Sequence, residues 1–231
     1  MDIAAGIMAV VIAYLLGSIP GAYIVTRFAY RQDIRKLGGG NVGAHNVYLH
    51  LGFKAAIPVA IIDVGKGAMA ILMALRLTGM PSMQSFSILM VCVLAAGLAA
   101  VAGHIWPVYL RFTGGNGIAT TIGVLAILMP RELLIVLGLS LVLMVITRNP
   151  VLSVNLSLLL LVVFAWFSGD PRQYFFFLIS LGLLLVIHFI PDARDALGKA
   201  GGMKKLAAEL VRTDEASNRA VKTKRQKVRK A

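Results

Sequence analysis

Residues 35–46 read RKLGGGNVGAHN and form the first polar, glycine-dense stretch in a chain that is otherwise mostly apolar. They come soon after a run of 24 uncharged residues, Ile3 to Thr26. The glycines let the backbone turn tightly and direct several N–H groups toward one point, which is the geometry of an anion nest. Two cations at the start of the stretch and two Asn amides within it add further hydrogen-bond donors. The stretch therefore predicts a phosphate-binding loop at the edge of an apolar region.

A second stretch of the same kind follows about seventy residues later. Residues 113–117 read TGGNG, and they too lie at the edge of an apolar run. We expect the two loops to meet at a membrane surface and to hold a phosphate group between them.

The composition decides the class of protein. The chain has 231 residues, of which 58% are hydrophobic and only 14% charged, and its mean hydropathy is +0.83. Soluble domains carry about a quarter of charged residues. We therefore expect an all-α polytopic integral membrane protein in the cell membrane, the inner membrane where there are two. The single cysteine gives no information on redox compartment.

The apolar runs predict seven transmembrane helices. A kink is expected in the first run at residues 17–21, which read GSIPG. Six spans are the alternative, because the runs on either side of Pro130 are short. The predicted spans are 3–26, 55–75, about 82–107, 118–129, about 130–147, 151–168 and 174–190.

The distribution of cations predicts the orientation. With seven spans, one side of the membrane holds seven Lys and Arg residues in its loops, and the other side holds three. By the positive-inside rule the richer side is cytoplasmic, which places the N-terminus outside and both glycine loops and the C-terminus inside. We divide the chain into a membrane domain, residues 1–198, and a basic cytoplasmic tail, residues 199–231. No aromatic residue interleaves with the charges of the tail, so we expect no nucleic-acid partner.

Three polar residues within or beside the predicted spans are candidates for chemistry. Asp63 and Lys66 lie three residues apart and therefore share one helix face. They form either a mutually neutralising structural pair or a pair in which Lys66 faces the cytoplasmic site. His104 lies at a membrane boundary and is read equally well as an interfacial residue or as a site residue. The four histidines form no metal-binding pattern, so we expect no metal and no cofactor.

The motifs together resemble one family, the bacterial membrane glycerol-3-phosphate acyltransferases of the PlsY type, which use acyl-phosphate as donor. Residues 33–46 resemble the family's DIRxxGSGNxGATN loop, and residues 63–67 match its DxxKG motif. Residues 103–120 resemble GHxFPxxxxFKGGKGxAT, and the stretch from His188 to Gly198 falls on HRxNIxRLxxG. The resemblance covers about residues 10–200.

This resemblance implies a fold of seven spans and an enzyme that moves an acyl group from acyl-phosphate to glycerol 3-phosphate, giving lysophosphatidic acid for phospholipid synthesis in contact with membrane lipid. The expected catalytic residue is His188. The expected substrate-binding residues are Arg35, Gly38, Gly39, Gly40, Asn41, Asn46, His104, Arg111, Gly114, Gly115, Asn116 and Gly117.

The chain departs from the family pattern at several polar positions. Gly39 and His45 replace a serine and a threonine of the first loop, and Leu49 replaces an arginine. Thr113 and Asn116 replace two lysines of the second loop, and Pro191 replaces an asparagine after His188. Residues that would compensate for the lost cations are Arg35, Lys36, Lys66, Arg111 and His45. Two alternatives remain beside the enzyme: a non-catalytic paralogue that binds a phosphate headgroup or a partner enzyme, and a small anion transporter.

Overall fold

The computed structural model describes residues 3–80, 87–169 and 171–200. In these residues every regular element is a helix. The contacts divide the chain into two units, Met1–Val186 and Ile187–Ala231. The predicted start of the third span at Ser82 and all but the first two residues of the predicted basic tail lie outside the described residues, and the predicted boundary at residue 198 stays a prediction.

The first predicted span is interrupted, as the GSIPG sequence indicated. Helix α1 (Ile3–Gly17) ends at Gly17, and α2 (Gly21–Ala29) begins after a short break that ends with Pro20. Glycines let α1 approach its neighbour α5 closely, because a Cβ at Gly17 would collide with the carbonyl oxygen of Ala100 and one at Gly103 with that of Tyr14. Small residues at such contacts are the usual means of packing helices in membranes.

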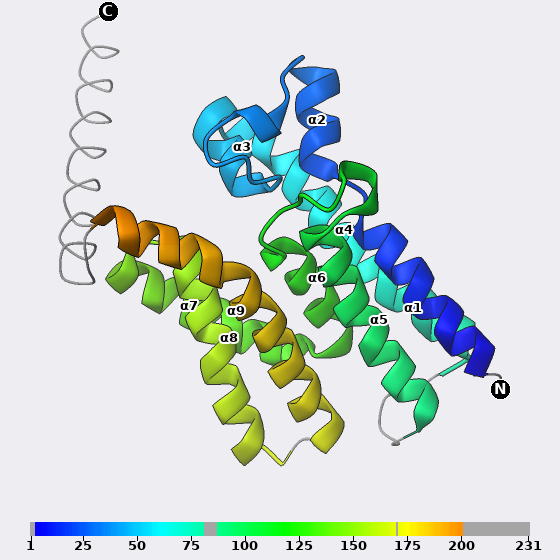
Figure 1. Cartoon of the computed structure of the whole chain (residues 1–231). Coiled ribbons are helices and arrows are strands. Elements are labelled where there is room, and N and C mark those ends of the chain that lie inside the picture. Colours follow the sequence, from blue (N-terminus) through cyan, green and yellow to red (C-terminus); the bar gives the residue numbers. More distant parts are fainter. Residues whose placement is uncertain (1–2, 81–86, 170, 201–231) are drawn as a thin grey trace, which may run out of the picture. The chain divides into compact units, whose positions relative to one another are not determined.

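The loop predicted between the first two spans contains helices of its own. A short 3-10 turn, η1 (Ile34–Lys36), precedes the glycines, and α3 (Ala44–Leu51) follows them. Gly52, with φ of +85°, ends α3 and leads directly into α4 (Phe53–Thr78). The sequence did not predict α3 because its eight residues lack the length and periodicity that identify a helix. In Figure 1, α2 and α3 lie beside the start of α4.

The remaining helices follow the predicted apolar runs. They are α5 (Ile88–Ile105), the 3-10 turn η2 (Val108–Leu110), α6 (Ile118–Leu128), α7 (Pro130–Thr147), α8 (Pro150–Phe167) and α9 (Arg172–Ala200). The uncertain division between the fourth and fifth spans falls at Met129, with Pro130 as the first residue of α7.

Five segments in the described part of the chain are long and apolar enough to cross a membrane, namely Ile3–Ala29, Phe53–Thr78, Ile88–Leu110, Pro130–Thr147 and Arg172–Phe189. Two shorter apolar helices, Ile118–Leu128 and Val151–Phe167, coincide with the other two predicted spans, and the number of seven spans stays a prediction. The chain is therefore an all-helical, multi-pass membrane protein.

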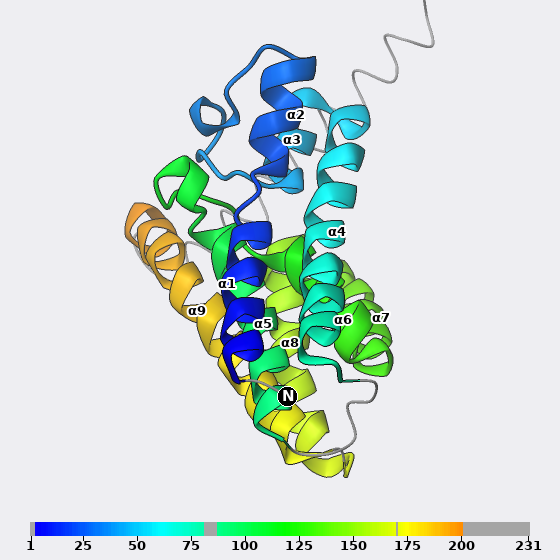
Figure 2. The ribbon, with the colours of Figure 1, turned by 90° about the vertical axis from the view of Figure 1, so that its right-hand side faces the viewer.

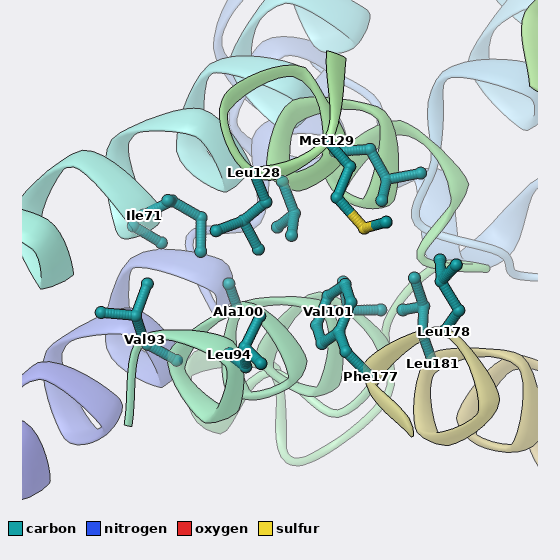
Figure 3. Close-up of a cluster of buried hydrophobic side chains, with 14 of the residues drawn as sticks. Ile71, Val93, Leu94, Ala100, Val101, Leu128, Met129, Phe177, Leu178 and Leu181 are labelled. Carbon is teal, nitrogen blue, oxygen red and sulfur yellow. The ribbon is translucent and has the colours of Figure 1, made fainter. Parts of the chain in front are cut away.

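A core of buried apolar side chains joins the helices of the first unit. Ile71 of α4 lies near Val93 and Ala100 of α5, and Leu128 closes the cluster from the end of α6 (Figure 3). Phe177 and Leu181 extend it onto α9. In both ribbon views α1 and α4 run beside α5 (Figures 1 and 2). These contacts hold α4, α5 and α6 together, the helices that carry or adjoin the polar residues described below.

Candidate functional site

The two glycine-rich loops lie against each other, as the sequence predicted. The backbone N–H of Val42, in the first loop, donates to the carbonyl oxygen of Gly114 in the second at 3.1 Å. The backbone N–H of Gly115 donates to the carbonyl oxygen of His104, also at 3.1 Å, and so ties the second loop to the end of α5. Two segments about seventy residues apart in sequence thus form one backbone assembly.

The second loop needs glycine because other groups approach its backbone closely. A Cβ at Gly114 would collide with the carbonyl oxygens of His104 and Ile105. A Cβ at Gly115 would meet the His104 Nε2 and, at 2.8 Å, the carbonyl oxygen of Val42. These glycines therefore bring the second loop into contact with the imidazole and with the first loop.

The first loop is closed by the side chain of Asn46. This buried amide donates from its Nδ2 to the carbonyl oxygens of Leu37, at 3.0 Å, and of Asn41, at 2.9 Å. Gly38 and Gly40 have φ of +56° and +76°, the left-handed region that favours glycine. Asn46 thus fixes the shape of the loop from within.

A cavity of about 210 Å³ lies where the two loops meet. Both loops, α4, α5, the start of α6 and the start of α8 contribute to its walls. The lining residues are Asn41, Gly43, Ala44, His45, Asp63, His104, Asn116, Gly117, Ile118, Ala119, Val151 and Val154.

Two helix N-termini open onto this cavity. Helix α3 starts after Gly43 and α6 starts after Gly117, and neither start carries a side-chain cap. The first N–H groups of a helix lack partners within the helix and carry the positive end of its dipole. The N-terminus of α8, by contrast, is capped by Asn149, which accepts from the N–H of Leu152 at 3.1 Å. The starts of α3 and α6 are therefore suited to an anion such as phosphate.

A buried group of charged side chains lies behind the cavity. Lys66 Nζ is 2.9 Å from Asp63 Oδ1 and donates to the carbonyl oxygen of Ile19 at 2.8 Å, where α1 and α2 meet. The Nδ1 of His104 is 3.5 Å from the same Asp63 oxygen. The Asp63 side chain is 1% exposed, and its Oδ2 has no hydrogen-bond partner among the described residues. This arrangement holds the His104 ring between α4 and the second loop.

Of the residues predicted to bind substrate, four line the cavity: Asn41, His104, Asn116 and Gly117. Gly114 and Gly115 support the wall, and Asn46 closes the first loop. Gly38, Gly39 and Gly40 belong to that loop but not to the lining. His188 belongs to the second unit, Ile187–Ala231, and its catalytic role stays a prediction.

The two predicted arginines are not among the lining residues. Arg35 Nη2 is 2.7 Å from Asp33 Oδ2, and its guanidinium lies over the Tyr23 ring, 4.9 Å from the centroid. The side-chain hydrogen bonds from Arg35 lower the pKa of the Asp33 carboxyl to about 2, and the same bonds raise the pKa of Arg35. Arg111 follows η2 and is exposed, with φ of +54°.

The sequence analysis missed three contributions to the cavity. It weighed Asp63 only as half of an ion pair, although the DxxKG motif already drew attention to that carboxylate. His45 was noted as a departure from the family pattern and as one of five residues that would compensate for lost cations, but not as a residue of the site. Nothing in the local sequence indicated that Val151 and Val154 of α8 would reach the site.

Comparisons with known proteins agree with this geometry. The family described as Glycerol-3-phosphate acyltransferase matches residues 7–197. A protein named glycerol-3-phosphate acyltransferase 2 from Dehalococcoides mccartyi is 38% identical over 195 residues, covering 84% of this chain and 89% of that protein. A glycerol-3-phosphate acyltransferase from Thermoanaerobacter pseudethanolicus is 38% identical over 183 residues, covering 79% and 87%.

A solved structure gives the same result. The crystal structure of PlsY (YgiH), described as an integral membrane glycerol 3-phosphate acyltransferase in its glycerol 3-phosphate form, superposes with a TM-score of 0.72. It shares 30% sequence identity, and the match covers 84% of this chain and 92% of that one. The sequence motifs, the shared fold and the named relatives thus agree, and the chain belongs to the glycerol-3-phosphate acyltransferase family of membrane enzymes.

Proposed function

We propose that this chain transfers an acyl group from an acyl-phosphate to the 1-hydroxyl of glycerol 3-phosphate and releases lysophosphatidic acid and phosphate. The relatives are named glycerol-3-phosphate acyltransferases, and the PlsY structures are described as glycerol 3-phosphate and lysophosphatidic acid forms. The observation that carries the proposal is the cavity at which both glycine loops and two uncapped helix N-termini meet.

The chemistry asks for positioning rather than for a protein nucleophile. An acyl-phosphate is an activated mixed anhydride, so the glycerol hydroxyl oxygen attacks the acyl carbon. The bond between that carbon and the bridging oxygen breaks, and the phosphate leaves with this oxygen as inorganic phosphate. Backbone N–H groups of the loops and helix starts bind phosphate oxygens, and Asn41 and Asn116 orient them. His188 is the proposed acceptor of the hydroxyl proton or a phosphate ligand.

We further propose seven spans with the N-terminus outside and both glycine loops in the cytoplasm. Five long apolar helices and two shorter ones support the number, and the excess of Lys and Arg on one side supports the orientation. Labelling of single cysteines from either side, in a variant in which Cys92 is replaced, tests this. Residue 39 should react only from the cytoplasm, and reaction from the outside would contradict the orientation.

The function is tested by offering the purified protein three donors in parallel: an acyl-phosphate, the matching acyl-CoA and the matching acyl carrier protein thioester. Labelled glycerol 3-phosphate is the acceptor. We expect labelled lysophosphatidic acid with acyl-phosphate alone, and loss of turnover in Asn116→Ala and His188→Ala. Turnover only with a thioester would contradict the proposed donor.

The two alternatives predict different results in the same preparation. A binding paralogue would be protected by glycerol 3-phosphate against heat unfolding but would form no product. A transporter would accumulate glycerol 3-phosphate in sealed vesicles under a gradient.

A further inference from the structure

The lining of the cavity contains no lysine and no arginine among the described residues. This is unusual for a site that holds a phosphate monoester, because charge-assisted hydrogen bonds are about twice as strong as neutral ones. Helix N-termini supply only about half a unit charge each. A cationic side chain close to the phosphate would therefore add substantially to binding.

Of the residues proposed from the sequence to compensate for the lost cations, only some lie at the cavity. Arg35 is bound to Asp33 and stacked on Tyr23. Lys66 is buried between Asp63 and the Ile19 carbonyl. Neither these two nor Lys36 and Arg111 are among the lining residues, whereas His45 is.

His45 also lies at a helix N-terminus, where an anion bound in the cavity would be close to its side chain. It is the second residue of α3, whose N-terminus carries no side-chain cap, and it is exposed at the cavity. A cation at a helix N-terminus is repelled by the helix dipole, and an anion placed there interacts favourably with both. The other imidazole of the lining, His104, is buried against Asp63 and Gly115, so it faces protein groups.

A second feature of the cavity indicates a ligand with a hydroxyl group. Asp63 is a lining residue whose side chain is 1% exposed, and no group in the described part of the chain donates a hydrogen bond to its Oδ2. A buried carboxylate oxygen without a donor is costly unless a ligand or water supplies one. Phosphate cannot do this well because it is itself an anion, but an alcohol can.

We propose that the His45 imidazole binds the phosphate of a phosphomonoester in this cavity and that Asp63 accepts a hydrogen bond from a hydroxyl of the same ligand. This assignment rests on the proposed function and gives the acceptor substrate an orientation. Its phosphate lies at the starts of α3 and α6, and its glycerol end points toward α4. His45 thus takes over a role for which the described residues of the cavity wall include no lysine or arginine.

The test compares His45→Gln and His45→Arg with His50→Gln as matched control. His50 lies one turn further along α3, bonds to the Asn46 carbonyl at 3.0 Å and does not line the cavity. Two readouts are taken on the purified full chain: the KM and kcat for glycerol 3-phosphate, and protection against heat unfolding by glycerol 3-phosphate, inorganic phosphate and glycerol.

We expect His45→Gln to raise the KM for glycerol 3-phosphate on the order of tenfold. The apparent dissociation constant obtained from thermal protection should rise by a similar factor, and kcat should change by less than about threefold. His45→Arg should restore the KM and the apparent dissociation constant to within about threefold of wild type. His50→Gln should match wild type in KM, kcat and thermal protection. Glycerol 3-phosphate should protect more than inorganic phosphate, and glycerol should not protect.

The outcomes separate this inference from the proposed function. Wild-type turnover with an unchanged KM and unchanged protection in His45→Gln would overturn the inference and leave the function standing. Protection that depends on His45 in a protein without turnover would uphold the site and overturn the function. Failure of His45→Arg to restore binding would show that the effect of His45→Gln is structural, and equal protection by phosphate and glycerol 3-phosphate would remove the role of Asp63.

Discussion

The two glycine-rich loops look alike in sequence but are held in different ways. The first loop is exposed at Gly38 and Gly39, and it is shaped by Asn46 and by the surface pair of Asp33 and Arg35. The second is packed against His104, which is held in turn by the buried pair of Asp63 and Lys66. Glycine therefore allows left-handed backbone turns in the first loop and close contact with neighbouring backbone and His104 in the second. A glycine-rich sequence alone does not distinguish these two uses.

The largest expected effect compares the two ion pairs. Lys66→Met leaves Asp63 buried without its cation and should lower the free energy of unfolding by about 3–5 kcal/mol. Arg35→Met breaks a pair in which the Arg35 side chain is 40% exposed, and it should cost about 1 kcal/mol or less. Heat unfolding in detergent measures both. Equal losses would mean that the first loop is anchored as firmly as the second.

The same substitution in each loop tests the two uses of glycine. Gly114→Ala would drive a methyl group into two backbone carbonyls and should cost about 3 kcal/mol, with loss of turnover. Gly39→Ala meets nothing within 4 Å and should change stability by less than about 0.5 kcal/mol. A tolerated Gly114→Ala would show that the second loop is not closely packed.

Removing the clamp of the first loop should have a smaller effect. Asn46→Ala deletes two hydrogen bonds to backbone carbonyls and should cost about 2 kcal/mol. Turnover should fall because Asn41 loses its support. The exposed amide Gln32 in the same segment provides the control, and Gln32→Ala should behave as wild type in both unfolding and turnover. If Asn46→Ala instead keeps full stability and loses only turnover, Asn46 contacts substrate rather than the loop.

The smallest effect is the pH dependence of the Asp33 pair. Its folded pKa of about 2 lies below the ordinary value of 3.8, so the pair contributes fully above pH 3.8 and loses its contribution as the pH falls through about 2. The difference in melting temperature between wild type and Asp33→Asn should therefore shrink from about pH 5 to about pH 2. A difference that is constant over this range would rule out the carboxylate as its source.

Much of this architecture could be predicted from the sequence because its causes are local. Runs of apolar residues predicted the helices, residues 17–21 predicted the break between α1 and α2, and two glycine loops at helix ends predicted a shared site. The contribution of α8 could not be predicted, because Val151 and Val154 are ordinary apolar residues whose place depends on tertiary packing. The same holds for His45 and Arg35, since only the folded chain shows that the His45 side chain lines the cavity and that Arg35 is paired with Asp33.

The account depends most on the two loops forming one site, and a double-mutant cycle tests this directly. Asn41 and Asn116 line the cavity from different loops, so Asn41→Ala, Asn116→Ala and the double variant are compared by kcat/KM for glycerol 3-phosphate. We predict non-additive losses with a coupling of at least about 0.5 kcal/mol, as expected for residues that share a ligand. Losses that add to within that margin would mean that the two loops act independently and would contradict the account.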